Sequence, residues 1–386
     1  MNNVHINMNE FTNASRVLKQ VNSLTKNGIF EKITIIALGS EKLKEYEKIT
    51  DDIDLHRIRL YTRNLPKNLL FQFLKYLEFF IRTIFILYKI KPAVVNAHAL
   101  GVLPFALSAK YLFKSLVVYD AHELETEQVA GMNLRKKISK WFERKLIRKV
   151  DMMIVVSESI ADWYVNEYDI KRPSVVLNAP NKRELKANNH FREQLAIRDE
   201  QVILLYQGGL FAGRGVQLIL EAFKERSDDK VIAVFMGYGE LEQDIKSVAA
   251  ERNNVFFFPA VPPQVVLEYT SSADMGIHLI QNTCLNHDYC MPNKLFEYSM
   301  AGLPIIVSNM KDMSELVIEN NMGTVISDFS VNGINQAIDD FLNQNLIVMK
   351  ENAYRVACEN SWEVQEQKML VAYEDMFRNK DFTKCQ

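Results

Sequence analysis

The sequence predicts an α/β fold made of two doubly wound domains that face each other across a cleft. The chain has 386 residues, more than one hydrophobic core usually serves, so two domains are expected. Short apolar runs alternate with longer amphipathic patterns, as in parallel sheets whose strands are joined by helices. The alternation occurs twice, on either side of a polar segment at 181–201. Two such sheets would bind ligands at the carboxyl ends of their strands.

The predicted strands are short runs rich in β-branched and aromatic residues. In the first half they cover 33–38, 54–60, 93–99, 115–120, 152–157 and 174–177. In the second half they cover 202–207, 231–236, 255–259, 275–279, 304–308 and 323–326. Helical patterns lie between them, for example at 15–26, 217–226 and 314–319. We therefore expect one domain at 1–180 and a second at 181–366.

Charge is distributed unevenly along the chain. Residues 1–180 carry 27 Lys and Arg against 19 Asp and Glu, whereas residues 181–386 carry 19 against 29. The basic first half indicates a polyanionic or membrane-surface partner. The second half must bind any anion through local geometry, because its overall charge is negative.

Several features predict a cytoplasmic protein. The four cysteines (284, 290, 358 and 385) lack disulfide-like or metal-type spacing, which favours free thiols in a reducing compartment. The polar N-terminus does not resemble a signal peptide. The most apolar stretch, 69–90, is interrupted by four charged residues and is not expected to span a bilayer.

Three motifs resemble known sites but are incomplete. The glycines at 208–215 lack the Lys-Ser/Thr pair of a P-loop, and Gly237-Tyr238-Gly239 follows the second strand of its domain, not the first. His122-Glu123 opens like a zinc-protease motif, but Thr126 stands where the second His is needed. A kinase-like NTPase, a dehydrogenase and a zinc protease are therefore disfavoured, and no metal or other cofactor is expected.

The first informative block is YQGGLFAGRGVQLILEAFKE at 206–225. A strand ends, a glycine-rich loop follows, and a helix begins near Gly215. Glycines at 208 and 209 allow close backbone approach to a ligand, and a helix N-terminus presents free amides to an anion. Arg214 adds a positive charge suited to a diphosphate. A tight turn with a surface arginine is the alternative interpretation.

The second block is CMPNKLFEYSMAGLPIIVSN at 290–309. Pro292-Asn293 is typical of a turn before a helix, Lys294 lies in the first turn, and Glu297 follows one turn later. Such a helix could place Lys294 at phosphate oxygens while Glu297 accepts hydrogen bonds from a ribose diol. A solvated surface glutamate is the alternative.

Together the two blocks resemble glycosyltransferase family 4, whose GT-B architecture has two Rossmann-like domains. The matching segments, in order, are Arg214-Gly215, Gly237-Tyr238-Gly239, Ser272-Ala273-Asp274, Glu297 with Ala301-Gly302-Leu303-Pro304, and Ser361-Trp362. In that family a last helix, here at 367–386, returns to the first domain. The resemblance implies donor-binding roles for Gly208, Gly209, Arg214, Gly237, Tyr289, Pro292, Asn293, Lys294, Leu295 and Glu297.

The first half resembles the family more loosely. The matching segments are Asn13-Ala14-Ser15-Arg16-Val17, 117–127, 149–164 and Asn178-Ala179-Pro180. By this resemblance His122 would reach the donor sugar or the reacting centre, and Asp120 and Glu123 are grouped with it as catalytic candidates. Asp120 and Glu123 could instead only orient the loop and the histidine. His98 lies at another strand end, where a role in the core is equally compatible.

Two positions depart from the family pattern. Tyr289 stands where the family usually has a glutamate that contacts the donor sugar, so the identity of the sugar does not carry over. Gly209 stands where the family often has an arginine, and Lys294 is expected to supply the missing charge.

The segment 133–150 combines an apolar stripe with many basic residues. We assign Arg16, Lys136, Lys137 and Trp141 to acceptor or membrane contacts, because a basic amphipathic helix can lie on anionic lipid. The alternative is a helix whose apolar stripe packs against its own domain, with a solvated basic side. The Phe- and Tyr-rich stretch 69–90 offers a second contact with lipid.

The resemblance implies a retaining, metal-independent glycosyltransferase of the hexosyltransferase type. It would move a sugar from a nucleotide-diphosphate donor, expected to be a UDP-sugar, to a glycan or lipid-linked glycan in cell-surface polysaccharide synthesis. Expected partners are the donor, the acceptor and an anionic membrane surface, but not nucleic acid. The alternatives are a nucleotide-sugar epimerase of the same architecture and a non-catalytic subunit that binds a sugar nucleotide.

Overall fold

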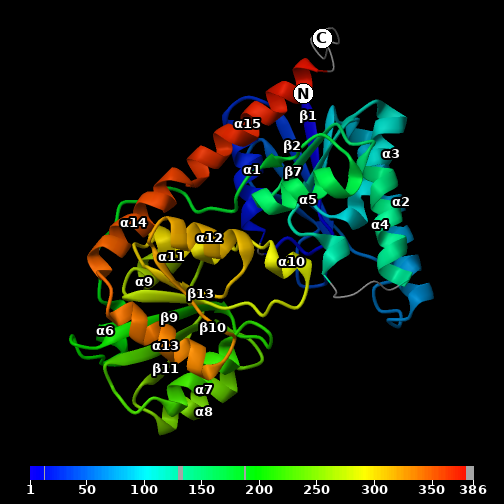
Figure 1. Ribbon diagram of the computed structural model, residues 1–386. Helices are drawn as coiled ribbons and strands as arrows, with labels where there is room; N and C mark the ends of the chain where they lie inside the picture. The colour runs from blue at the N-terminus through cyan, green and yellow to red at the C-terminus, as the bar shows by residue number, and fades with distance from the viewer. Residues whose placement is uncertain (13, 129–133, 187, 380–386) are drawn as a thin grey trace. The chain divides into compact units, whose positions relative to one another are not determined.

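The computed structural model describes residues 1–12, 14–128, 134–186 and 188–379 (Figure 1). Asn13, Cys385, the start of the basic segment at Asn133 and the end of the last expected helix lie outside these ranges. The chain divides into two compact units, Met1–Val176 with Glu366–Gln386, and Leu177–Gln365. The chain passes between them at 176–177 and 365–366, where the sequence suggested 180–181 and 366–367.

Unit 1 contains an eight-stranded sheet in the order β3-β4-β2-β1-β5-β6-β7-β8. Every pairing is parallel except that of the edge strand β3 with β4. The order reverses between β1 and β5, which makes this the switch point of a doubly wound sheet. The strands are β1 (Asn2–Ile6), β2 (Lys32–Leu38), β3 (Tyr46–Lys48), β4 (Ile53–Ile58), β5 (Val94–Ala97), β6 (Leu116–Ala121), β7 (Met152–Val155) and β8 (Ser174–Val175).

The helices of unit 1 cover both faces of this sheet. Figure 1 shows α2, α3 and α4 on one side and α1 and α15 on the other. For α1, α2, α3 and α4, which join strands of the sheet, right-handed crossovers require this arrangement. The helices are α1 (Ser15–Lys26), α2 (Leu69–Ile90), α3 (Leu103–Phe113), α4 (Leu134–Ile147) and α5 (Glu158–Tyr168), with short turns η1 (Leu100–Val102) and η2 (Glu125–Glu127).

The central strand β1 was not expected, because the N-terminus looks polar. Its side chains alternate between Val4 and Ile6 on one face and Asn3 and His5 on the other, and all four are completely buried. Polar side chains at the centre of a sheet hide the apolar pattern by which strands are recognised.

Unit 2 contains a six-stranded, fully parallel sheet in the order β11-β10-β9-β12-β13-β14. Its switch point lies between β9 and β12. The strands are β9 (Val202–Gly209), β10 (Val231–Tyr238), β11 (Val255–Pro259), β12 (Met275–His278), β13 (Ile305–Val307) and β14 (Gly323–Val325). The helices are α6 (His190–Leu195), α7 (Val216–Glu225), α8 (Glu242–Glu251), α9 (Val266–Thr270), α10 (Leu285–Asp288), α11 (Asn293–Met300), α12 (Lys311–Glu319), α13 (Val331–Leu342) and α14 (Leu346–Glu359). The predicted doubly wound α/β class is confirmed in both units.

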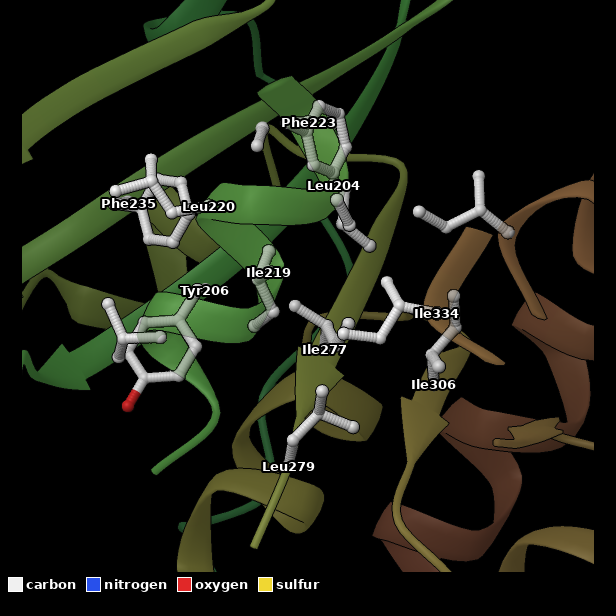
Figure 2. Close-up of a cluster of buried hydrophobic side chains, with 14 of the residues drawn as sticks. Leu204, Tyr206, Ile219, Leu220, Phe223, Phe235, Ile277, Leu279, Ile306 and Ile334 are labelled. Carbon is white, nitrogen blue, oxygen red and sulfur yellow. The ribbon is translucent and has the colours of Figure 1, made fainter. Parts of the chain in front are cut away.

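Two apolar clusters enclose the sheet of unit 2. One contains Leu204 and Tyr206 of β9 with Ile219 of α7, as Figure 2 shows. The other contains the alternate β9 residues, Ile203 and Leu205. Because both faces of the sheet are covered, its strands are apolar throughout, which explains why they were recognisable in the sequence.

The last helix, α15 (Trp362–Arg378), begins in unit 2 and continues in unit 1. Its first residue, Trp362, donates its backbone N–H to the Pro180 carbonyl. In unit 1 the hydroxyl of Tyr373, which is 1% exposed, accepts a hydrogen bond from Asn96 of β5. The helix therefore packs over the buried polar face of the first sheet.

Candidate functional site

The loop between β9 and α7 depends on glycines. Gly208 has φ +109° and Gly215, the N-cap of α7, has φ +74°. A Cβ on residue 215 would lie 2.5 Å from the Cβ of Leu279, so a larger residue does not fit. The Tyr206 hydroxyl donates to the Gly209 carbonyl at 2.9 Å and fixes the start of the loop. No side chain caps the first amides of α7, which can therefore bind an anion.

Two of the predicted donor-binding glycines serve close packing. A Cβ on Gly237 would lie 1.8 Å from the Gly208 carbonyl oxygen, so Gly237 lets the end of β10 approach β9. A Cβ on Gly208 would lie 2.7 Å from Cε of Lys294. The glycine loop and the start of α11 are thus in direct contact, and Lys294 lies along the backbone of the loop.

Lys294 is the most unusual charge of unit 2. Its Nζ is buried, has no hydrogen-bond partner among the described residues, and lies 4.8 Å from the centre of the Tyr206 ring. Burial and, to a lesser extent, the positive charge of Arg214 lower the pKa of Lys294, Glu297 partly opposes them, and the resulting pKa is about 8. A buried ammonium without a partner is costly, and an anion bound beside it would remove that cost.

Glu297 lies one turn after Lys294 and is held from two sides. It accepts hydrogen bonds from Gln207 Nε2 at 2.7 Å and from Asn293 Nδ2 at 3.2 Å. Gln207 is itself fixed by the Thr270 hydroxyl, which donates to Gln207 Oε1 at 2.7 Å. This network orients the carboxylate at the end of β9 and leaves it half-buried, where it can accept further hydrogen bonds.

The other predicted residues of this block have different surroundings. Pro292 is the N-cap of α11, as expected. Leu295 is completely buried in the core, and its amide donates to the Pro292 carbonyl, so it supports the helix. Tyr289 ends α10 and has the Lys311 ammonium 5.4 Å from its ring centre. Arg214 is exposed at the mouth of the loop.

His278, at the carboxyl end of β12, was missed by the sequence analysis. It is 2% exposed, and neither ring nitrogen has a hydrogen-bond partner among the described residues. Burial, followed by the charges of Lys294 and Arg214, holds the pKa of His278 well below its usual value, so the ring is neutral. The available signal was a polar residue at the end of a predicted strand beside the switch point.

In unit 1, Asp120 at the end of β6 is the centre of a buried polar cluster. Arg16 of α1 binds both carboxylate oxygens, at 2.9 and 3.2 Å, and Gln20 donates to Oδ2 at 2.8 Å. His122 Nε2 lies 3.0 Å and His98 Nδ1 3.3 Å from the same Oδ2. The neighbouring Arg16 and His122 hold the pKa of Asp120 well below its usual range despite complete burial.

A third histidine, His5 of β1, extends this cluster. Its Nδ1 lies 2.8 Å from His98 Nε2, and the two rings are stacked with centroids 5.0 Å apart. Burial lowers the pKa of both His5 and His98, so both rings are neutral. His98 therefore supports the cluster from the core, one of the two roles considered for it, and His5 was not anticipated.

The ionised state of Asp120 determines the tautomer of His122. Because a carboxylate only accepts hydrogen bonds, His122 Nε2 must carry the proton that it shares with Oδ2. The side chain of His122 is 34% exposed. Its Nδ1 is thus the nitrogen available to a ligand, and it accepts when the ring is neutral.

Glu123 and Glu125, which follow His122, have different surroundings. Glu123 is exposed and accepts a hydrogen bond from Gln128 at 2.8 Å. Glu125 accepts from the Leu100 backbone N–H at 2.7 Å, and burial raises its pKa to about 7. Of these two carboxyl groups, that of Glu125, two residues beyond the predicted one, is the more buried and interacts electrostatically with His122.

His98, Asp120 and His122 together present three potential metal-ligating atoms within 4.8 Å of one another. These same atoms are hydrogen-bonded to each other, and Arg16 already neutralises the carboxylate. A divalent cation at this position would face the Arg16 guanidinium. The surroundings are those of an ion pair that orients histidines.

Two predicted acceptor or membrane contacts need correction. Arg16 is 5% exposed and engaged with Asp120, so it is not a surface contact. Lys136 pairs with Glu127 at 2.5 Å on the inner side of α4. Lys137 and Trp141 are exposed as expected. The alternative in which the apolar stripe packs inward is wrong for Leu134, Ile138, Trp141 and Phe142, which are exposed, whereas Leu146 and Val150 are half-buried.

Comparisons with known proteins agree with this architecture. Residues 15–180 match the family model Glycosyltransferase Family 4, and residues 187–357 match Glycosyl transferases group 1. A lipopolysaccharide 1,2-N-acetylglucosaminetransferase of Salmonella typhimurium is 26% identical over 52% of this chain and 56% of that protein. The lipopolysaccharide glucosyltransferase WaaG of Escherichia coli is 26% identical over 54% and 58%. The matched region spans little more than half the length of these relatives.

Solved structures share the fold along nearly the whole chain. A sucrose-phosphate synthase from Thermosynechococcus elongatus has a TM-score of 0.80 at 15% identity and covers 98% of this chain and 100% of its own. HepE of Anabaena, solved with UDP and glucose, has a TM-score of 0.71 at 13% identity, with coverages of 97% and 100%. The two family models together account for most of both units, and the chain belongs to the group 1, family 4 glycosyltransferases of GT-B fold.

Proposed function

We propose that this protein transfers a sugar from a nucleoside-diphosphate sugar to a glycan or lipid-linked glycan, without a metal and with retention of configuration. The observation that carries the proposal is the buried, unpartnered Nζ of Lys294 against the glycine loop. A diphosphate carries the opposite charge to the buried ammonium, and it can also accept hydrogen bonds from the uncapped helix amides. A UDP-sugar is the proposed donor, and cell-surface polysaccharide synthesis is the proposed process.

The proposed chemistry requires charge stabilisation on the leaving diphosphate. As the bond between the anomeric carbon and the diphosphate oxygen breaks, negative charge grows on that oxygen and positive charge on the sugar ring. Lys294, Arg214 and the first amides of α7 are preorganised donors for the growing negative charge. Glu297 would accept hydrogen bonds from the ribose hydroxyls.

We assign His122 to the donor sugar. Its Nδ1 can accept a hydrogen bond from a sugar hydroxyl, because Asp120 holds the proton on Nε2. Asp120, Arg16 and His98 position this ring without contacting substrate. Of the three catalytic candidates, we therefore assign only His122 to contact with the substrate, and Asp120 is a positioning residue.

The named relatives support the acceptor class. Two are lipopolysaccharide glycosyltransferases, and others carry putative roles in colanic acid and teichuronic acid biosynthesis. HepE was solved with UDP, which supports UDP as the nucleotide. An acceptor of this kind is presented at a membrane, so an anionic membrane surface is part of the proposal.

The test is binding of UDP, GDP and ADP sugars, measured by thermal shift and calorimetry with a chelator present. A ligand at about one hundred times its Kd adds about 2.7 kcal/mol to the free energy of unfolding. We expect one nucleotide to stabilise the protein and this effect to vanish in Lys294→Ala. Lys246→Ala, which removes an exposed lysine of α8, is the control. Equal stabilisation of the wild type and Lys294→Ala would contradict the proposal.

A second candidate is a non-catalytic subunit that binds a sugar nucleotide. It is favoured by Tyr289, which replaces the glutamate that the family uses at the donor sugar. Donor binding without turnover on any glycan acceptor, unchanged in Tyr289→Glu, would select this candidate. Donor turnover to an epimerised sugar without an acceptor would identify an epimerase.

A further inference from the structure

Helix α2 carries a continuous apolar stripe on its exposed side. Leu70, Phe73, Ile81, Phe85 and Tyr88 are 65%, 60%, 44%, 66% and 63% exposed, at spacings of three, four or eight residues. Leu77, 38% exposed, fills the gap between Phe73 and Ile81. These spacings place all six side chains on one face of the 22-residue helix. Only Phe79, Thr83 and Leu87 of the helix are buried.

Three of the four charged residues of α2 bind the preceding loop, and the fourth, Lys89, is exposed. Glu78 accepts hydrogen bonds from the backbone amides of Tyr61 and Thr62, and Lys75 donates to the Leu65 carbonyl. Arg82 binds the Arg59 carbonyl. The polar side of α2 is therefore used to hold the segment 59–65, and the side left to solvent is apolar.

Helix α4 is oriented with its apolar stripe outward. On the inner side, Lys136 and Lys140 both bind Glu127, at 2.5 and 2.8 Å. Glu143 is completely buried and accepts hydrogen bonds from the hydroxyls of Tyr164 and Tyr168, at 2.8 and 2.6 Å. These bonds fix the rotation of the helix. As a result Leu134, Ile138, Trp141 and Phe142 are 74%, 57%, 61% and 41% exposed.

The two stripes belong to one side of unit 1. Helix α3 contacts both α2 and α4 and contributes Tyr111 and Leu112, which are 67% and 60% exposed. Figure 1 shows the three helices on the same side of the sheet. We call these exposed apolar residues of α2, α3 and α4 the apolar face. Among the described residues, no helix is both long and apolar enough to cross a bilayer.

The exposed charged residues of these helices are all basic. Their two acidic residues are Glu78 and Glu143, and both are engaged as described above. Arg135, Lys137 and Lys145 of α4 are exposed, so basic side chains border the apolar face. Apolar and aromatic side chains bordered by Lys and Arg match the boundary between acyl chains and anionic headgroups.

We infer that unit 1 docks on anionic lipid through the apolar face, with the side chains of α2 and α4 inserted among the acyl chains. The exposed lysines and arginines contact the headgroups, and the partly buried Lys136 and Lys140 act only to hold α4 in this orientation. This inference deepens the membrane part of the proposed function. It does not depend on sugar transfer, because docking needs neither donor nor acceptor.

A second copy of the chain fits this face less well. A two-fold contact would bring the same patch of both copies together and gather Arg135, Lys137 and Lys145 of both copies at one interface. Like charges at such an interface repel, whereas an anionic bilayer attracts all of them. The charge pattern thus selects lipid over self-association.

The experiment is flotation of the full-length protein with vesicles of phosphatidylcholine, with and without phosphatidylglycerol. Trp141 provides a local signal, since Trp362 is 3% exposed and Trp163 packs on Tyr164. We expect binding to anionic vesicles with a blue shift of tryptophan emission that Trp141→Phe removes. Phe73→Glu combined with Ile138→Glu should lower the partition coefficient at least about tenfold.

A matched control replaces exposed apolar residues of unit 2. Ile318 and Ile347 are 64% and 71% exposed, so Ile318→Glu combined with Ile347→Glu makes the same chemical change elsewhere. We expect this variant to bind vesicles like the wild type. Lys137→Glu combined with Lys145→Glu should also lower binding about tenfold or more, and only on anionic vesicles.

Two outcomes would overturn the inference. The first is equal vesicle binding by the unit 1 and unit 2 variants, with donor binding intact in both. The second is a dimer in light scattering that Phe73→Glu with Ile138→Glu converts to a monomer, together with no vesicle binding by the wild type. If the wild-type protein binds vesicles but no nucleotide-sugar donor, the result would count against the proposed function alone.

Discussion

Two buried cations, Lys294 in unit 2 and Arg16 in unit 1, differ in whether the protein supplies them with hydrogen-bond partners. The Nζ of Lys294 has no partner among the described residues, whereas Arg16 makes two bonds to Asp120 and a third to the Val176 carbonyl. A paired buried charge contributes to the structure, and an unpaired one imposes a cost that a ligand can relieve. The comparison separates a residue that positions others from one that binds substrate.

The largest expected effect is on stability, in Arg16→Met. Removing the guanidinium leaves the Asp120 carboxylate buried without its main counter-charge, so the free energy of unfolding should fall by about 3–5 kcal/mol. Urea denaturation measures it. Arg172→Met, which removes an exposed ion pair with Glu158, should cost less than about 1 kcal/mol. An equal decrease in the free energy of unfolding of the two variants would show that the buried pair contributes no more to stability than the exposed pair.

The opposite pattern is expected for Lys294→Met. Methionine keeps the apolar stem and removes a buried, unpartnered charge, so the free energy of unfolding should stay unchanged or rise. Turnover should fall by about 10²–10³, the effect of losing one preorganised donor. Initial-rate assays and urea denaturation on the same sample test both parts. A destabilised but active variant would show that Lys294 is a structural residue.

The pH dependence of donor binding sharpens the assignment of Lys294. Burial brings its pKa to about 8 in the free protein, so above that pH the free protein lacks the proton that a diphosphate requires. The affinity for a UDP-sugar should be constant below pH 8 and fall by up to about tenfold per pH unit above it. Calorimetry between pH 6.5 and 9.5, chosen to bracket that value, measures it. Lys294→Met should show weak binding without this pH dependence.

The elements of unit 2 were largely readable from the sequence, whereas the central strand of unit 1 was not. The predicted strand 255–259 is observed with the same bounds, because it belongs to a sheet covered on both faces. Strand β1 was missed because Asn3 and His5 are buried within it. Asn96, on the neighbouring strand β5, donates a hydrogen bond to Tyr373, which lies 277 positions further along the chain. No local sequence pattern can indicate such a distant partner.

The candidate site shows the same limit. Lys294 and Glu297 were identified because a local helix motif places them one turn apart. Arg16 was taken for a surface contact because its partner, Asp120, is 104 positions away. The helical period of α4 was recognised, but its rotation is set by Glu127 and by tyrosines of another helix. Sequence periodicity defines a face, and distant polar partners decide which way it points.

A smaller effect on stability than that of Arg16→Met is expected for Glu125, an acid without the counter-charge that Asp120 has. Burial raises its pKa to about 7, above the ordinary value of 4.5, so the folded state resists ionisation. For an acid with a raised pKa, the folded state is penalised once the unfolded chain ionises. Stability is therefore lost as pH rises from about 4.5 to about 7. Glu125→Gln should unfold like the wild type at pH 4.5 and be more stable by up to about 3 kcal/mol at pH 8. Thermal unfolding at both pH values measures the difference, with Glu123→Gln as the exposed control. A lower stability of Glu125→Gln at pH 8 would mean that the hydrogen bond from Leu100 to an ionised carboxylate outweighs its burial.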